Sequence, residues 1–280
     1  MKGTVCVIGA AGGVGAAVAR ALLAAGADVI GSVLNDAEEQ LAHELAPGIR
    51  RLVRMDLGDA TSVPAAMDDL LADPALKRLT AVVVCAAISP FGPVELMPVE
   101  ALRRTLEINT VSVVTIFQKS IPWLRRSKGR FVPISSMAGK VAIPFIGHYA
   151  ASKHALEALS DAMRREVAEF GVEVILVEPG SVKTGMVLEQ PRLVDAAIAR
   201  LTPAQKKLYG KRYRRWKELT TGGYDNGFPP ETVSKCVMQA LTAKRPRTRY
   251  LTDSVAEGLI GAAKTMSDRQ LDKYLARAMG

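Results

Sequence analysis

Short runs of β-branched residues alternate with Ala- and Leu-rich stretches along most of this 280-residue chain, and this order constrains the fold more than any other feature. The runs at 4–9, 27–33, 49–57, 79–87, 129–136 and 172–179 are expected strands, with helical stretches between them. They read as continuous apolar segments, which is typical of strands buried on both faces. Repeated βα units of this kind predict an α/β fold, a Rossmann-like doubly wound parallel sheet with helices on both faces.

No linker, internal repeat or low-complexity tract interrupts the pattern, so we expect residues 1–280 to form a single domain. The regular order ends after Gly180, where residues 181–230 are strongly charged and punctuated by Gly and Pro. An insert beyond the carboxyl end of a parallel strand is well placed to cover a ligand crevice. We therefore expect 181–230 to be a substrate lid and 253–280 to be a helical extension.

The formal net charge is +9, and much of it comes from basic clusters at 206–217 and 244–249. A solvated helix face and a basic loop are the first interpretation of these clusters. A docking surface for an anionic substrate, a carrier or an acidic membrane is the second. Nucleic-acid binding is disfavoured, because no recognised reader motif accompanies the charge.

Several features indicate a cytoplasmic protein. The N-terminus enters a strand-like run too early to leave room for a signal peptide, and no apolar run reaches the roughly 18 residues of an integral membrane segment. Cys6, Cys85 and Cys236 are far apart without a CxxC spacing, which is typical of reduced thiols. The histidines show no paired ligand pattern, so we expect no metal site.

A glycine-rich loop follows the first expected strand, in the segment VCVIGAAGGVGAAVARAL. Gly9, Gly13 and Gly15, with Val14 between them, let the backbone turn sharply and let a pyrophosphate approach the next helix. At that helix N-terminus, free N–H groups and the helix dipole favour negative charge. In the first βα turn of a parallel sheet this pattern predicts dinucleotide binding.

The end of the second strand favours NAD, with NADP as the alternative. An acidic side chain there binds the adenosine ribose, whereas Arg or Lys accommodates a 2′-phosphate. No cation lies between Ile30 and Gln40, and Leu34, Asn35 and Asp36 stand where the ribose is expected. Asn35 or Asp36 can bond the ribose, and either can equally cap the next helix. The end of the third strand offers two contacts for the adenine, or an ordinary loop cap: Asp56 and Leu57.

A tyrosine and a lysine stand one helical turn apart in GHYAASKHALEAL, residues 147–159. Tyr149 and Lys153 would share one face of a helix, which places a cation beside a phenol. The YxxxK spacing is short and common, and alone it indicates a surface pair. Ser136, thirteen residues before the tyrosine, and Asn109 in LEINT favour a catalytic pair instead.

With these motifs the chain resembles the short-chain dehydrogenase/reductase family over residues 3 to about 186. The glycine loop, LEIN, ISS, YAASK and VEPGSVKT stand in the order and spacing of that family. The segment from FVPISSMAGK to VEPGSVKT is most similar to the branch that handles retinols and hydroxysteroids. The resemblance implies an NAD(P)-dependent alcohol dehydrogenase or ketone reductase.

The resemblance assigns a role to each catalytic residue. Tyr149 would be the general acid and base at the substrate oxygen, its pKa lowered by Lys153 and by the oxidised nicotinamide. Lys153 would also hold the nicotinamide ribose, and Ser136 would orient the substrate oxygen. Asn109 would hold a water that links Lys153 to solvent. The hydride would pass directly between the nicotinamide and the substrate carbon.

The resemblance also implies further cofactor contacts after the fourth and sixth strands, at Ala86, Ala87, Pro179, Gly180, Val182 and Thr184. The chain departs from the family pattern at VCAA, residues 84–87, where NNAG is usual. Val84 cannot make the hydrogen bond of the first Asn, and Ile8 replaces the usual Thr before Gly9. These departures concern cofactor binding and leave the catalytic residues intact.

The expected substrate contacts are mostly apolar: Ile88, Phe91, Ser136, Met137, Ile143, Phe145, His148 and Met186. They favour a hydrophobic secondary alcohol or ketone, such as a steroid, a terpenoid or an aromatic. A reductase of acyl-thioester or polyketide carbonyls is the alternative, and a non-catalytic dinucleotide sensor is a further one. Family resemblance and the long Ala/Leu-rich helices predict a homodimer or homotetramer.

Overall fold

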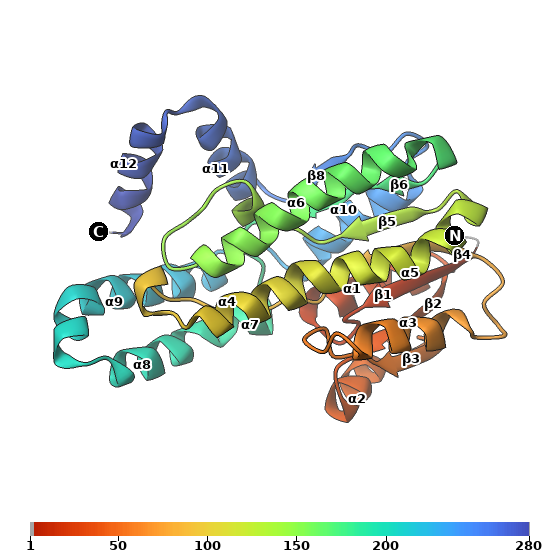
Figure 1. Cartoon of the computed structure of the whole chain (residues 1–280), viewed down its shortest axis with the longest axis horizontal. Helices are drawn as coiled ribbons and strands as arrows, with labels where there is room; N and C mark the ends of the chain where they lie inside the picture. Colours follow the sequence, from red (N-terminus) through yellow and green to blue (C-terminus); the bar gives the residue numbers. More distant parts are fainter. Residues whose placement is uncertain (1–2, 280) are drawn as a thin grey trace.

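The structure is a computed structural model that describes residues 3–279, and a parallel sheet lies at its centre (Figure 1). Six strands follow the order β3-β2-β1-β4-β5-β6: β1 Thr4–Ile8, β2 Asp28–Val33, β3 Arg51–Arg54, β4 Leu79–Val84, β5 Arg130–Pro133 and β6 Glu173–Val174. A second pair, β7 Leu176–Glu178 and β8 Arg249–Leu251, is also parallel. A bridge between Ile134 and Val177 continues the sheet from β5 to β7. The predicted fold class is confirmed.

Helices cover both faces of this sheet and enclose two apolar clusters. One face carries α1 Gly13–Ala24, α2 Asp36–Leu45 and α10 Pro230–Thr242. The other carries α3 Ser62–Leu71, α5 Ser112–Ser127 and α6 Gly147–Val167. Successive side chains of β1 point to opposite clusters, Val5 and Val7 to the first, Cys6 and Ile8 to the second. Burial on both faces explains why this strand has no polar alternation.

The helical stretch between β4 and β5 is interrupted. It consists of α4 Val99–Leu106, a π-helical turn η2 Glu107–Val111, and α5. Asn109 lies in the π turn, where one extra residue per turn redirects its side chain from the line of the helix. The remaining single turns are η1 Val94–Leu96, η3 Met137–Gly139 and η4 Ala168–Phe170.

Two groups of helices stand together beyond one end of the sheet (Figure 1). The first is α7 Gly185–Leu188, α8 Gln190–Arg200 and α9 Pro203–Asp225, and the second is α11 Ser254–Thr265 and α12 Asp268–Met279. Phe145 anchors the first group, because its ring stacks on Trp216 at 5.8 Å and meets Tyr213 edge-on at 5.0 Å. Within residues 3–279, the helices lack the combination of length and apolarity that a membrane span requires.

Candidate active site

A cavity of about 1140 Å³ lies at the carboxyl ends of β1, β4 and β5. Its wall combines the loop after β1, the segment 134–138 after β5, the first turns of α6, and residues 179–187. Side chains of α9, α11 and α12 complete the side away from the sheet: Trp216, Leu219, Thr220, Val255, Leu259, Tyr274 and Leu275. The cavity thus stands where open α/β sheets bind their ligands.

The glycine loop forms a cradle that side chains would fill. Gly9 has a φ of +81°, and a Cβ on Gly15 would lie 1.9 Å from the carbonyl oxygen of Gly9. Helix α1 begins after Gly12 without a side-chain cap. Gly12 and Gly13 line the cavity, so this helix N-terminus is open to a ligand there. This backbone fits a pyrophosphate. Ala86 packs against the loop, because a Cβ on Gly9 would lie 2.6 Å from the Ala86 methyl group.

Three of the expected catalytic side chains line the same cavity: Ser136, Tyr149 and Lys153. Tyr149 lies in the first turn of α6, and the ammonium of Lys153 lies 5.7 Å from its ring centroid. Lys153 is buried and donates a hydrogen bond to the carbonyl of Ile134, 2.8 Å away. Ser136 caps the turn η3 by accepting a hydrogen bond of 3.1 Å from the N–H of Ala138. Lys153 and Ser136 are therefore positioned by hydrogen bonds to the backbone.

Burial governs the protonation of this group. It raises the pKa of Tyr149, and a hydrogen bond with Ser136 opposes that rise. Burial also lowers the pKa of Lys153 to about 8, against the opposing charge of Glu157. Desolvation thus outweighs the hydrogen bond with Ser136 and raises the pKa of the phenol, and the expected lowering beside the oxidised nicotinamide stays a prediction. At neutral pH the phenol keeps its proton, which suits a proton donor.

Asn109 lies behind the cavity wall and is fully enclosed. Its Oδ1 accepts from the N–H of Ile88 at 2.9 Å, and its Nδ2 donates to the Ile88 carbonyl at 2.8 Å and to Ser152 Oγ at 3.0 Å. These bonds join the loop after β4 to helix α6. The predicted water contact of Asn109 therefore stays a prediction, and the contacts seen here are structural.

Most of the expected cofactor contacts line the cavity: Gly9, Gly13, Val14, Gly15, Ala86, Ala87, Pro179, Gly180, Val182 and Thr184. Four expected at the adenosine end do not: Leu34, Asn35, Asp56 and Leu57. Asn35 is the N-cap of α2 and accepts from the N–H of Glu38 at 3.0 Å. Asp56 bonds the N–H of Gly58 at 2.8 Å, so both side chains serve the loop caps that the sequence left open.

Two charged residues at this end were missed by the sequence reasoning. Glu38 lines the cavity and its carboxylate accepts from the N–H of Leu34 at 2.8 Å. Arg54 pairs in register with Val33 across β2 and β3, and its guanidinium forms an ion pair with Asp36. The parallel register of the third strand would have indicated Arg54, which lies beyond the segment 30–40 at the end of the second strand.

The expected substrate contacts divide into two sets. Ser136, Met137, Ile143 and Met186 line the cavity, and Ile88, Phe91, Phe145 and His148 do not. Ile88 presents its backbone to Asn109, while Phe91 and Phe145 pack in the core below the α7–α9 segment. His148 is buried, and its Nδ1 has no hydrogen-bond partner among residues 3–279. Apolar composition alone cannot separate wall from core, since both exclude charge.

The comparisons with known proteins agree with this geometry. The model of the short chain dehydrogenase family matches residues 3–192. The NADPH-dependent 3-dehydrocapnine reductase of Ornithobacterium rhinotracheale is 32% identical over 95% of this chain and 94% of its own. Retinol dehydrogenase 16 of Homo sapiens is 32% identical over 88% of this chain and 79% of its own.

Solved structures share the fold across almost the whole chain. A short-chain dehydrogenase from Streptomyces avermitilis superposes with a TM-score of 0.78 at 22% identity, covering 99% of this chain and 97% of its own. A short chain dehydrogenase from Burkholderia cenocepacia, solved in complex with NADP, gives 0.73 at 21% identity, with 99% and 98% covered.

Proposed function

The chain belongs to the short-chain dehydrogenase family, and from that premise we propose that it transfers a hydride between a nicotinamide dinucleotide and a hydrophobic secondary alcohol or ketone. NAD(P)-dependent oxidoreduction is the activity of the family. The observation that carries the substrate class is the composition of the cavity wall. Among the residues described, Glu38 and Lys153 are the only charged members of that wall. The part between η3, α9, α11 and α12 is apolar, which suits a bulky uncharged molecule.

The cavity gives each catalytic group a role in ketone reduction. Tyr149, protonated at neutral pH, would donate its proton to the carbonyl oxygen as negative charge develops there. Ser136 would share that oxygen and fix its position, and the Lys153 ammonium would stabilise the phenolate that remains. The bound nicotinamide would supply the hydride. Asn109 would support the chemistry through the loop that holds Ile88.

The dinucleotide would lie from the glycine cradle to the segment at Pro179 and Gly180. We propose NADH as the preferred form, because the carboxylate of Glu38 lines the adenosine end and would repel a 2′-phosphate. Arg54 lies outside the described wall and already pairs with Asp36. A preference for NADPH is the competing outcome, because the similar 3-dehydrocapnine reductase is NADPH-dependent.

The residues 181–230 would act as the substrate lid, as the sequence predicted. Met186, Trp216 and Thr220 contribute to the wall that faces the catalytic residues. The chain after β8 adds α11 and α12 to the same wall, and we propose that these helices hold the distal part of an extended apolar substrate. A carrier-bound acyl substrate would instead need the exposed cations of α9: Lys206, Lys207, Lys211, Arg212 and Arg214.

A panel of ketones tests the substrate class. Purified protein is incubated with NADH, or separately NADPH, and with a ketosteroid, an aromatic ketone, a long-chain alkyl ketone and a β-ketoacyl thioester. We expect oxidation of the dinucleotide with the uncharged bulky ketones at a rate insensitive to salt. Turnover of the thioester alone, lost at high salt, would favour the carrier-dependent alternative. Absence of turnover with tight dinucleotide binding would favour a sensor.

A further inference from the structure

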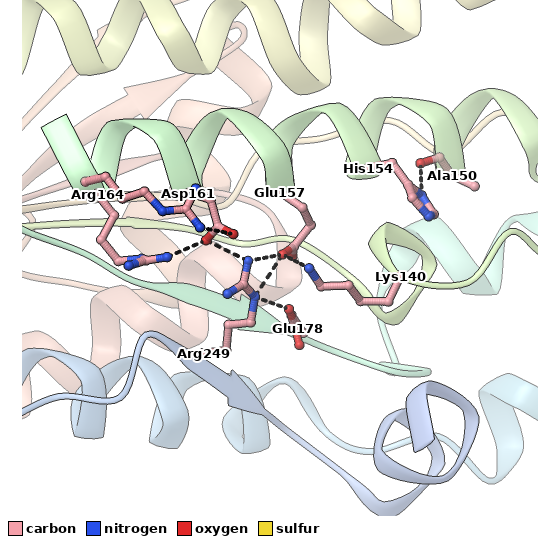
Figure 2. Close-up of polar contacts among 9 residues, drawn as sticks. Lys140, Ala150, His154, Glu157, Asp161, Arg164, Glu178 and Arg249 are labelled. Carbon is pink, nitrogen blue, oxygen red and sulfur yellow. Dashed lines mark hydrogen bonds and ion pairs between the residues drawn. The ribbon is translucent and has the colours of Figure 1, made fainter. Parts of the chain in front are cut away.

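A cluster of charged side chains gathers beside α6, one helical turn beyond Lys153 in the sequence (Figure 2). Its centre is Glu157 on α6, whose side chain is 4% exposed. The Oε2 atom of Glu157 accepts from Lys140 Nζ at 2.6 Å and from Arg249 Nη2 and Nε at 3.0 and 3.1 Å. Lys140 follows the turn η3, and Arg249 belongs to β8, so the contacts converge on α6 from two other elements.

The cluster also reaches the loop where the nicotinamide would lie. Arg249 Nε lies 3.1 Å from Glu178 Oε1, and Glu178 directly precedes Pro179. Gly139 allows the close packing between the segments, because a Cβ there would lie 3.0 Å from Glu157 Cγ and 3.1 Å from the Lys153 carbonyl. The cluster therefore touches the turn opened by Ser136, the catalytic helix and the nicotinamide loop.

Glu157 and Glu178 both contact the guanidinium of Arg249. Glu157 Oε1 is buried and has no hydrogen-bond partner among residues 3–279. Two ionised carboxylates on one guanidinium repel each other, which favours the protonated form of one of them. Burial, and then the charge of Glu157, raise the pKa of Glu178 to about 7.

Glu157 is the anion that lies one helical turn from Lys153 on α6. The other groups around the ammonium are the Ile134 carbonyl, the Tyr149 ring and the thiol of Cys85. Burial raises the pKa of this thiol to about 12, so the thiol is neutral. Further along the helix, Asp161 accepts hydrogen bonds of 2.9 Å from Arg249 and from Arg164 (Figure 2). Glu157 thus supplies the negative charge that opposes the desolvation of Lys153.

We propose that Glu157 is a positioning residue for the reaction. Its charge, held in place by Lys140 and Arg249, keeps the Lys153 ammonium protonated. The same contacts hold the catalytic helix against the loop at Pro179. This inference rests on the role of Lys153 in the proposed function, and it adds an electrostatic support behind the cavity that takes no part in substrate contact.

The test is the pH dependence of dinucleotide affinity, measured by the fluorescence of NADH and of NADPH between pH 6 and 10. The neutral amine of Lys153 loses its charge-assisted bond to the ribose, so affinity falls as pH rises through its pKa. Glu157→Gln keeps the shape but removes the charge, and we expect the midpoint of this fall to move about one pH unit lower. At pH 6 the two proteins should bind NADH alike.

Lys140→Met provides the opposite change. Lys140 is 29% exposed and Arg249 still binds Glu157 after its loss, so the less screened Glu157 should move the midpoint to higher pH. Asp161→Asn is the matched control, because it removes another carboxylate that binds Arg249 and should leave the midpoint unchanged. If Glu157→Gln does not fold, the upward shift in Lys140→Met alone carries the test.

Unchanged midpoints in both variants, or shifts of the same sign, would overturn the inference. A wild-type protein that binds neither NADH nor NADPH would instead contradict the proposed function, so the two failures are distinguishable. Where the ketone panel yields a substrate, the basic limb of kcat should shift with the same signs. A purely structural role would lower stability without moving either midpoint.

Discussion

At the scale of single residues, Gly15 has the least room for a side chain in the dinucleotide cradle. A Cβ there would lie 1.9 Å from the Gly9 carbonyl oxygen, whereas one on Gly12 would lie 3.7 Å from the same atom. We expect Gly15→Ala to lower the free energy of unfolding by about 3 kcal/mol and to abolish NADH binding. Gly12→Ala should fold normally. Thermal denaturation and NADH fluorescence measure both effects, and normal binding by Gly15→Ala would contradict the cradle.

Glu38 tests the choice of dinucleotide at the same scale. Its carboxylate lines the adenosine end and accepts a hydrogen bond from the N–H of Leu34. The amide oxygen of Gln can accept the same bond. We expect Glu38→Gln to reduce the preference for NADH over NADPH roughly tenfold, since the change removes repulsion worth about 1.4 kcal/mol. The ratio of the two dissociation constants measures it. A wild type that prefers NADPH would contradict this role of Glu38.

The catalytic residues could be predicted individually, because their spacing and residue types carry the chemistry. Ser136, Tyr149 and Lys153 line one cavity, as their motifs indicated. Phe145 could not be placed in the same way. It adopts a φ of +74° and packs on Trp216, some 70 positions later in the chain. Contacts between such distant segments decide whether an apolar residue lies in the wall or in the core.

At the scale of elements, the charged contact between α6, β7 and β8 makes stability depend on pH. The pKa of Glu178 rises from 4.5 to about 7 in the folded protein, so the folded state binds more protons than the unfolded state between these values. Stability therefore falls as pH rises through this window. Gln mimics the protonated acid. We therefore expect Glu178→Gln to remove a pH-dependent loss in the free energy of unfolding on the order of 2 kcal/mol.

Urea unfolding of wild type and Glu178→Gln at pH 5 and pH 8 measures this difference. Between pH 5 and pH 8, the wild type should lose stability relative to Glu178→Gln. A pH-independent difference between the proteins would show that Glu178 does not retain a proton. Asp161→Asn serves as the comparison. Burial raises the pKa of the Asp161 carboxyl group, but its partners Arg164 and Arg249 outweigh burial, so this pKa is lowered overall.

The central strands β1 and β4 could be predicted from sequence because burial on both faces removes polar residues from them, whereas the strand expected at 172–179 is divided into β6 and β7. The π turn at 107–111 could not be predicted. Its extra residue is compatible with the helical pattern around it, and Asn109 is fixed by bonds to Ile88 and Ser152, which lie 21 and 43 positions away. The local sequence pattern does not indicate partners that are so distant in the chain.

At the scale of the whole molecule, helix α12 closes the cavity from the far end of the chain. Tyr274 and Leu275 line the wall together with Leu219 of α9. We expect Leu275→Asp to raise the KM for an apolar ketone about tenfold, because it places a charge where the substrate is desolvated. The dissociation constant of NADH should not change. Lys273→Gln, on the exposed side of α12, is the control, and equal KM values would exclude α12 from the substrate site.

The expected homodimer or homotetramer stays a prediction at this scale. Exposed apolar side chains such as Val111 and Leu159 lie along the π turn and α6, where a partner subunit could cover them. The expected lid at 181–230 also stays a prediction, although the chain order after β7 places Met186 and Trp216 in the cavity wall. The contribution of α12 does not follow from the sequence, because an amphipathic terminal helix can pack on a lid, a partner or a membrane.

The most direct test of the central claim compares Tyr149→Phe with wild type. The Tyr149 hydroxyl is the proton donor in our account, and the rest of the ring only fills the wall. We predict that Tyr149→Phe binds NADH as wild type does and reduces a bulky apolar ketone about 10³-fold more slowly. Reduction by Tyr149→Phe at a rate near that of wild type would contradict the account.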